Sequence, residues 1–252
     1  MPFLSCRQEF LVMSVEALPI DPKIQKALEG VTTATLTTVL LKKGLRNVWL
    51  RGAFPLVPQG KRIVGRAFTL RFVPAREDLA TPASWSSPIS TRAAIEAMPE
   101  GAIAVVDAMG ATDAGIFGDI LCARMKKRGV AALVTDGAVR DLEGVLGTDL
   151  PVWASGAAAP PSVASLTFVN WQEPIGCGGV AVFPNDYIVL DRDGAVLIPA
   201  DLINDVVDVA VEQERLEGWI MQEVDAGVPL PGLYPPNEAA AARYKAWRDT
   251  QK

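Results

Sequence analysis

The sequence predicts one α/β domain followed by a helical tail, and three patterns carry this prediction. Apolar runs at 102–106 and 130–134 flank a glycine-containing loop and a helical segment, which is the order of a βαβ unit. Residues 166–199 alternate short β-type runs with turn residues, and the pattern from 201 onward is helical. We find no internal repeat and no low-complexity linker, so a single α/β domain fits best.

The composition excludes several kinds of chemistry. The chain has 252 residues, half of them hydrophobic, and it contains no histidine. A Ser-His-Asp triad, a Cys-His dyad and histidine-ligated zinc are therefore excluded, and acid–base chemistry must come from carboxylates, Lys, Tyr, Cys or metal-bound water. The net charge of -5 lacks the basic excess of a general nucleic-acid binder, so no nucleic-acid partner is expected.

Cysteine usage and the N-terminus predict a cytoplasmic protein. Cys6, Cys122 and Cys177 show neither metal-ligand spacing nor an even disulfide framework, which is typical of a reducing compartment. We interpret the second and third of them as packing residues. Residues 1–12 lack the apolar core and cleavage site of a secretory signal, and Met13 is a possible natural start. No apolar run reaches the ~18 residues of a membrane span, so no membrane contact is expected.

Two helices and a strand are expected first. Asp21 as a cap and Pro22 at the first helical position predict a helix over 21–28. A second helix is expected over 32–43, and the threonines at its start either cap it or face a ligand; we favour capping. Residues 63–73 are partly β-branched and alternate in polarity, which predicts a strand.

A long polar loop over 74–90 precedes the βαβ unit, and loops of this length are often functional. Trp85 within it is a candidate lid or interface anchor. A helix over 91–98 follows the loop, and a short helix over 142–145 and a strand over 151–154 follow the βαβ unit.

The C-terminal half is expected to contain β-structure and then two helices. Strands are expected at 167–171, 180–183, 187–190 and 195–198, with a hairpin turn at 191–194 and a tight turn or bulge at the glycines around Cys177. A long helix over 201–224, a proline-rich linker over 227–236 and a helix over 237–247 follow. The chain then divides into an N-terminal extension (1–20), an α/β domain (21–226) and a linker with a C-terminal helix (227–252).

Candidate functional residues gather in the stretch 115–141, in the loops after the two strands of the βαβ unit, where ligands bind in open α/β sheets. Gly118 and Asp119 begin the intervening helix. On one reading, the Asp119 carboxylate only stabilises the helix N-terminus. On the other, the free amides of these two residues and of Ile120 and Leu121 hold a substrate carboxylate. The Asp119 side chain would then hold a metal-bound water or shuttle a proton.

Arg140 and Asp141 stand side by side after the second strand. They either form an ion-pair network at the start of the next helix or take part in chemistry. In the second case, the arginine binds a carboxylate or an enolate oxygen, and the aspartate is a hard oxygen ligand for Mg²⁺ or Mn²⁺. Complementary charges supplied by two loops at one sheet edge add support to the functional reading, and both readings stay open.

The spacing of these residues resembles a family signature. Gly115-x-x-x-Asp119, twenty intervening residues and then Arg140-Asp141 is similar to the pattern of the RraA-like family. That family includes class II 4-hydroxy-4-methyl-2-oxoglutarate/4-carboxy-4-hydroxy-2-oxoadipate aldolases and regulators of ribonuclease E activity. The resemblance extends over about 28–208 in the order and type of elements. It implies a swivelling β/β/α domain, assembled as a homotrimer or as a hexamer built from two trimers, with active sites between subunits.

The resemblance also implies roles for single residues. Asp141 would hold a divalent cation, Mg²⁺ or Mn²⁺, largely through waters, and Arg140 would contact a 2-oxo acid. Gly118, Ile120 and Leu121 would contribute to the amide cradle, and Asp119 would orient a metal-bound water. Family members also use an acidic residue of a neighbouring subunit. Our hypothesis for that role is one of three glutamates in the long helix, namely Glu212, Glu214 or Glu217, whose simpler interpretation is a solvated helix face.

The function implied is a metal-dependent carbon–carbon lyase, a class II aldolase. It would cleave a 4-hydroxy-2-oxo acid through a metal-stabilised enolate, release pyruvate and decarboxylate oxaloacetate as a side activity. Two alternatives stay open: a non-enzymatic regulator that binds a ribonuclease or helicase, and a dehydratase of a 2-keto-3-deoxy sugar acid.

Overall fold

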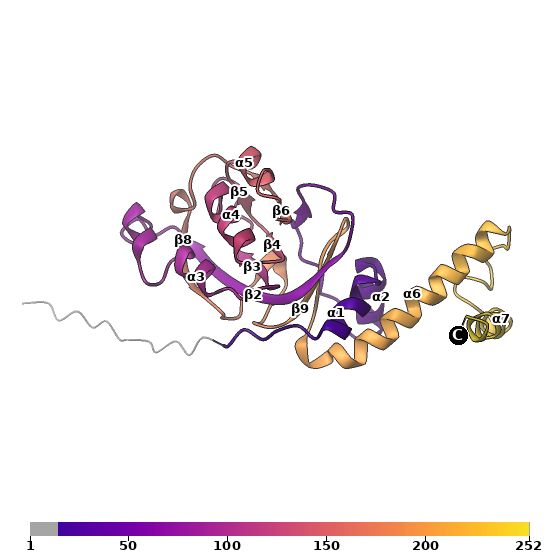
Figure 1. The fold of residues 1–252 in the computed structure, drawn as a ribbon. Coiled ribbons are helices and arrows are strands. Elements are labelled where there is room, and N and C mark those ends of the chain that lie inside the picture. The colour runs from indigo at the N-terminus through magenta and orange to yellow at the C-terminus, as the bar shows by residue number, and fades with distance from the viewer. Residues whose placement is uncertain (1–14, 252) are drawn as a thin grey trace, which may run out of the picture.

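The computed structural model describes residues 15–251, and Figure 1 shows a mixed α/β body from which the C-terminal helices extend. An eight-stranded sheet runs in the order β1-β6-β4-β3-β2-β9-β10, with β8 paired to β2, and a separate pair joins β5 to β7. The strands are β1 (Phe54–Pro55), β2 (Ile63–Pro74), β3 (Ile103–Asp107), β4 (Ala132–Thr135), β5 (Ala138–Val139), β6 (Val152–Ala154), β7 (Gly156–Ala157), β8 (Leu166–Trp171), β9 (Tyr187–Asp191) and β10 (Gly194–Ile198). The predicted α/β class is confirmed.

Seven α-helices surround this sheet or follow it within the described residues. They are α1 (Pro22–Glu29), α2 (Thr33–Lys42), α3 (Thr91–Ala97), α4 (Asp119–Lys127), α5 (Leu142–Leu146), α6 (Ile203–Asp225) and α7 (Glu238–Asp249). Short 3₁₀ segments are η1 (Pro82–Ser86), η2 (Ser162–Ala164), η3 (Cys177–Gly179) and η4 (Ala200–Leu202). The described helices include none long and apolar enough to cross a membrane. Residues 1–14 lie outside the described residues. The predicted lack of a secretory signal in 1–12, the possible start at Met13 and most of the expected N-terminal extension fall there.

The β/β/α layering follows from the strands of the βαβ unit, β3 and β4, which are buried throughout. Alternate residues of a strand point to opposite faces, so each strand contributes to two cores. Val106 and Leu133 pack with helix α4, whereas Val105 and Val134 pack toward β9 and β10. A helical layer therefore covers one face of the sheet and further β-structure covers the other.

The long strand β2 joins the two β-layers (Figure 1). Its first residues, 63–66, pair with β9, and its last residues, 70–74, pair with β8. Along its other edge, 67–71 pair in parallel with β3. The register shifts between Arg71 and Phe72, as it does at a β-bulge, which bends a strand. The sheet consequently curls into a nearly closed barrel.

One predicted strand, 180–183, is wrong. Within this segment only Val182 forms an isolated bridge, with Ile175. Gly178 and Gly179 have φ of 59° and 73°, so the chain turns tightly just before the segment and cannot run straight into a ladder. Val180 and Val182 are instead buried in the core. The tight turn expected at these glycines is confirmed, as is the 191–194 hairpin turn, which joins β9 to β10.

The capping interpretation of the threonines before α2 is confirmed. The Thr32 side chain accepts a hydrogen bond from the Thr35 amide at 3.1 Å. Glu214 accepts bonds from the Thr32 amide and hydroxyl, and Glu217 accepts one from the Thr35 hydroxyl. Glu212 accepts one from the Tyr244 hydroxyl. These three glutamates are half-buried, and each also has a partner in its own chain, so the helix face that they form is only partly solvated.

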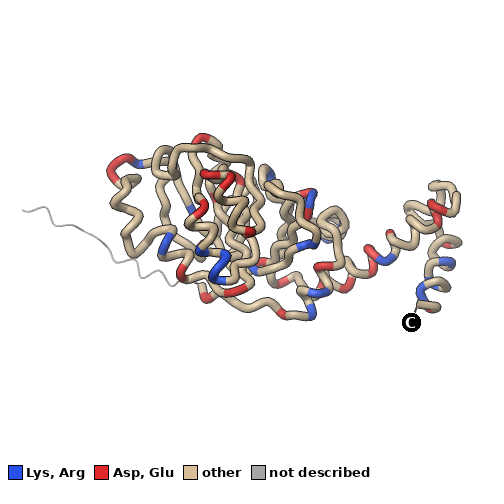
Figure 2. Tube along the Cα trace, turned by 45° about the horizontal axis from the view of Figure 1, so that its top comes forward, with Lys and Arg blue, Asp and Glu red and all other residues tan. Residues whose placement is uncertain are grey.

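The predicted helical tail is confirmed and extends from the body in Figure 1. The first half of α6 packs on α1 and α2, whereas its distal half carries α7. Trp219 of α6 and Tyr244 of α7 have ring centroids 5.5 Å apart. Two ion pairs join the same two helices: Arg248 lies 2.8 Å from Glu212, and Arg243 lies 2.6 Å from Glu223. Figure 2 shows residues of both charge signs along these helices.

A buried carboxylate holds together two loops at the ends of the central strands. Asp136, directly after β4, accepts hydrogen bonds from the Ala108 amide at 2.9 Å and the Gly178 amide at 3.0 Å. Asp136→Ala is expected to lower the free energy of unfolding by about 2–4 kcal/mol, because both amides lose their acceptor while buried. Chemical denaturation measures this, with Glu77→Ala at an exposed carboxylate as the control. Equal losses in both variants would contradict the role of Asp136.

Candidate active site

All six site residues predicted from the sequence line one cavity of about 480 Å³. It lies at the N-terminus of α4. Its lining consists of Trp85, Thr91, Arg92, Gly115, Ile116, Gly118, Asp119, Ile120, Leu121, Arg140, Asp141, Pro161 and Ser162. The two loops of the βαβ unit therefore meet, as their positions after neighbouring strands predict.

Backbone hydrogen bonds explain how residues about twenty positions apart become neighbours. The Ile116 amide donates to the Ala138 carbonyl, and the Arg140 amide donates to the Phe117 carbonyl, both at 2.9 Å. The loop before α4 thus runs alongside β5. Because α4 starts directly after the second of these bonds, Asp119 is held beside the residues that follow β5.

Glycine is required at the start of the motif for space. A Cβ built on Gly115 would lie 2.5 Å from both the backbone nitrogen and the Cβ of Arg140, closer than real contacts allow. A Cβ on Gly118 would meet the Arg140 Cγ at 3.3 Å. The two glycines allow the loop to approach the arginine closely, and the arginine stem rests on them.

Asp119 is the first residue of α4, with Gly118 as the cap. Its Oδ1 accepts a hydrogen bond from the Ile120 amide at 2.7 Å. The Ile120 amide, which was expected to be part of the cradle, is therefore already bound to the Asp119 carboxylate. The amides of Gly118 and Leu121 have no acceptor among the described residues. They stay free for an anion at the helix N-terminus, where the helix dipole also favours negative charge.

The position of Asp119 also depends on the next helix. A Cβ added to Gly144 of α5 would lie 2.7 Å from the Asp119 Cβ. Gly144→Ala is therefore expected to displace Asp119 and to lower the activity proposed below by about 10- to 100-fold, since displacements of about 1 Å have effects of this size. The assay proposed below for that activity measures this. Gly147→Ala, where the added Cβ meets only ordinary contacts from 3.4 Å, is the control and is expected to retain activity.

Arg140 and Asp141 do not form the ion-pair network that one reading predicted. The structure records no ion pair or side-chain hydrogen bond for either residue within 15–251, and both are exposed. Asp141 has φ 53° and ψ 53°, the left-handed conformation that few residues other than glycine adopt. Such conformations concentrate at functional sites. The Arg140 guanidinium and the Asp141 carboxylate thus line one cavity, and neither is paired with another described side chain.

The acidic residues of the cavity fit a hydrated cation better than a fully ligated one. Within the described residues there is no group of three or more His, Cys, Asp and Glu that could hold a metal ion. Mg²⁺ usually keeps several waters and is held by one or two carboxylates. The unpaired Asp141 carboxylate, with Asp119 lining the same cavity, matches that donor set.

Trp85 and Arg92 are cavity residues that the motif did not identify. Trp85 lies in η1 and Arg92 in the first turn of α3, with the guanidinium carbon 4.9 Å from the centre of the indole ring. Burial lowers the pKa of the Arg92 guanidinium. The length of the 74–90 loop and its single tryptophan were the only signals for this wall of the site.

The interpretation of two cysteines as packing residues is confirmed. Cys122 and Cys177 are buried. Burial, with the nearby Asp119 charge, raises the pKa of Cys122 to about 12, and burial raises that of Cys177 well above its usual value. Both thiols are therefore protonated at neutral pH and are poor nucleophiles.

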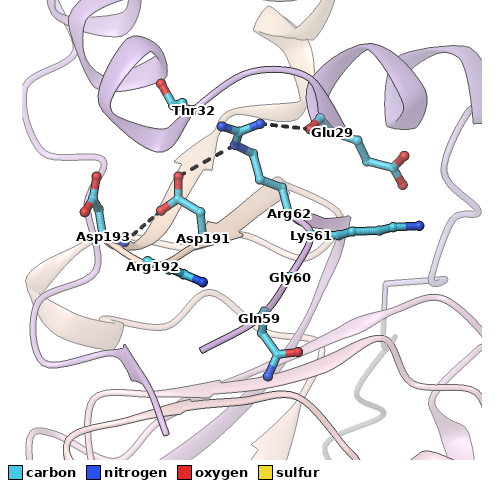
Figure 3. Close-up of a pocket in the computed structure, with 9 residues that line it drawn as sticks. All are labelled: Glu29, Thr32, Gln59, Gly60, Lys61, Arg62, Asp191, Arg192 and Asp193. Atoms are coloured by element: carbon cyan, nitrogen blue, oxygen red, sulfur yellow. Dashed lines mark hydrogen bonds and ion pairs between the residues drawn. The ribbon is translucent and has the colours of Figure 1, made fainter. Parts of the chain in front are cut away.

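A larger cavity, of about 710 Å³, lies away from the motif and is shown in Figure 3. Two of its charged side chains, Arg62 and Asp191, are engaged within the chain. Arg62 lies between the Glu29 carbonyl and the Asp191 carboxylate, and Asp191 also accepts bonds from the Thr33 amide and hydroxyl. This arrangement attaches the start of α2 to the β9–β10 hairpin, so we assign it a structural role.

Comparisons with known proteins agree with this geometry. The family model described as RraA-like, Aldolase/RraA, matches residues 33–197. Protein DlpA of Legionella pneumophila is 28% identical over 211 residues, which are 83% of this chain but only 33% of DlpA. "Putative 4-hydroxy-4-methyl-2-oxoglutarate aldolase" of Halalkalibacterium halodurans is 30% identical over 191 residues, covering 76% of this chain and 78% of that protein.

Two solved structures share the fold. Streptomyces coelicolor RraAS2, described as an unusual member of the RNase ES inhibitor RraA protein family, has a TM-score of 0.72 at 32% identity, covering 80% of this chain and 97% of that one. A protein of Pseudomonas syringae pv. tomato also has a TM-score of 0.72, at 26% identity, covering 86% and 99%. The predicted RraA-like fold is confirmed. From the motif, the fold and these matches together, we conclude that this chain belongs to the RraA-like family.

Proposed function

We propose that this protein is a divalent-metal-dependent lyase that cleaves a 4-hydroxy-2-oxo acid and releases pyruvate. One observation carries the proposal: an unpaired arginine, an unpaired carboxylate and free helix amides line the same cavity. The H. halodurans relative supports the reaction class through its name. Oxaloacetate decarboxylation is a proposed side activity, because it passes through the same enolate of pyruvate.

Arg140 and the start of α4 bind the reacting end of the substrate in this proposal. The amides of Gly118 and Leu121 receive the 1-carboxylate at the positive end of the helix dipole. The Arg140 guanidinium donates hydrogen bonds to the 2-oxo oxygen, where negative charge develops as the C3–C4 bond breaks. The glycines beneath the arginine stem fix its direction.

Asp119 moves the protons through a water molecule. A water held by its carboxylate accepts the proton of the 4-hydroxyl as C3–C4 breaks, and the electron pair passes into the enolate. A proton returned to C3 then completes pyruvate, while the other fragment leaves with a new carbonyl at C4. A divalent cation, which Asp141 would hold, would supply positive charge that offsets the negative charge of the enolate.

The test is pyruvate release from 4-hydroxy-2-oxoglutarate, 4-hydroxy-2-oxopentanoate and oxaloacetate. With Mg²⁺ or Mn²⁺ present, we expect pyruvate from at least one of them above the rate without enzyme, and EDTA is expected to abolish it. If the enzyme forms no pyruvate from any of the three, the lyase proposal is overturned. A 2-keto-3-deoxy sugar acid, assayed for water loss in parallel, tests the dehydratase alternative.

A second candidate is a regulator that binds a ribonuclease, and the likeness to RraAS2 favours it. Binding of the purified protein to a ribonuclease E-type enzyme, without pyruvate formation, would support this candidate over the lyase. We also propose assembly as a homotrimer or hexamer. The Ile120 side chain at the cavity, 76% exposed, is a surface that a neighbouring subunit would cover.

A further inference from the structure

A second arginine lines the same cavity as Arg140. Arg92 belongs to α3, so a different part of the chain supplies it. Its guanidinium stacks on Trp85, with the carbon 4.9 Å from the ring centre. Stacking on an aromatic face restrains a guanidinium in one plane while leaving its N–H groups directed outward.

Arg92 has no acidic partner within the described chain. Its one recorded hydrogen bond is a long one, 3.4 Å from Nη1 to the Thr91 hydroxyl. Arg124, in contrast, forms a two-pronged pair with Glu96 at 2.7 and 2.8 Å. Burial is the only cause that shifts the pKa of Arg92, with no nearby charge to offset it. A partly desolvated cation without a counterion is an energetic cost that a bound anion would remove.

The charge of the cavity points to a doubly negative substrate. Its charged lining residues are two arginines, Arg92 and Arg140, and two aspartates, Asp119 and Asp141, so the side chains sum to zero. The divalent cation of the proposed function would leave a charge of +2. A 2-oxo acid with one carboxylate offsets half of this charge, and a dicarboxylate offsets all of it.

We infer that Arg92, held by Trp85, is the residue that selects a substrate with a second carboxylate at the end remote from the 2-oxo group. This inference rests on the proposed function for the position of the reacting end. The planar guanidinium matches a carboxylate with two parallel hydrogen bonds, which lysine cannot reproduce. The loop 74–90 thereby acts in specificity by carrying the ring on which Arg92 rests.

Binding of two unreactive acids tests the inference directly. 2-Oxoglutarate and 2-oxopentanoate have the same chain length and differ only in the terminal carboxylate, and neither has a 4-hydroxyl. By calorimetry in Mg²⁺, the wild-type protein is expected to prefer 2-oxoglutarate by about 10- to 100-fold. In Arg92→Gln the ratio of the two affinities is expected to fall to about 1–2.

Matched variants separate this role from a structural one. Arg46→Gln makes the same charge change at an exposed arginine outside the cavity lining, and is expected to keep the wild-type ratio. Arg92→Lys keeps the charge without the planar fork, and is expected to give an intermediate ratio. Should Arg92→Gln fail to fold, the wild-type ratio and Arg92→Lys still decide. A wild-type ratio near one, or a full preference in Arg92→Lys or Arg92→Gln, would overturn the inference.

Turnover distinguishes failure of this inference from failure of the proposed function. The kcat/KM of Arg92→Gln for 4-hydroxy-2-oxoglutarate is expected to fall mainly through KM, because the second carboxylate is bound equally in ground and transition states. Pyruvate release without any preference for the dicarboxylate would sink only the role of Arg92. A preference in binding without pyruvate release from any substrate would instead sink the lyase and keep Arg92 as an anion site.

Discussion

Asp141→Asn is expected to lower pyruvate release by about 10³-fold while leaving the fold intact. The substitution removes the negative charge, which a divalent cation requires, and retains nearly the same shape. Asparagine also tolerates the left-handed backbone that residue 141 adopts, with φ 53°, so the loop should keep its conformation. Because no other described residue pairs with this carboxylate, its removal leaves no buried group unsatisfied.

Activity and Mn²⁺ binding, measured on the same preparations, check this expectation. We expect calorimetry to show Mn²⁺ binding to the wild type and a large loss of affinity in Asp141→Asn, with melting temperatures within a few degrees of each other in EDTA. Glu143→Gln, an exposed acidic residue two positions away, is the matched control and should bind the metal normally. Normal metal affinity in Asp141→Asn would remove Asp141 from the metal site.

The part of the cavity around the start of α4 could be predicted from the sequence, because local rules determine which residues meet there. Parallel strands place the loops that follow them at one edge, and a helix that starts at Asp119, with Gly118 as its cap, presents free amides there. The close approach of Gly115 to Arg140 is a tertiary contact, and the motif signalled it only through the absence of a side chain.

The wall of the cavity that Trp85 and Arg92 form could not be predicted in this way. Trp85 and Arg92 reach the cavity only because the loop 74–90 and α3 fold over the end of β2, where Phe72 stacks edge-on with Phe168 of β8. No local pattern records that long-range contact. In sequence, an arginine at the second position of a short helix is indistinguishable from a solvated one.

The wrong strand at 180–183 has a similar cause. The alternation of apolar residues in this segment correctly predicts which side chains are buried, since Val180 and Val182 are both in the core. Burial does not require a ladder, however, and two glycines with positive φ turn the chain before pairing can extend. Helical periodicity likewise cannot reveal the hydrogen bonds that Glu214 and Glu217 of α6 accept from Thr32 and Thr35, which lie 182 residues away in sequence.

Arg140→Lys is expected to reduce kcat/KM by about 10²- to 10³-fold, although the charge is conserved. The stem of Arg140 rests against Gly115 and Gly118, so the guanidinium is directed into the cavity by contacts along its length. A lysine would follow the same path but end in a point charge, without the planar N–H groups that stabilise the developing enolate oxygen. The loss should therefore appear mainly in kcat.

Two comparisons make the result for Arg140 decisive. Arg140→Gln is expected to be at least as inactive as Arg140→Lys, whereas Arg46→Lys, at an exposed arginine outside the cavity, should match the wild type. Single-turnover pyruvate formation separates slower chemistry from weaker binding. If Arg140→Lys retained the wild-type kcat with only a raised KM, the guanidinium would act in substrate binding and not in the chemical step. The stabilisation of the enolate would then fall to the cation held by Asp141, and the two aspartates would carry the chemistry.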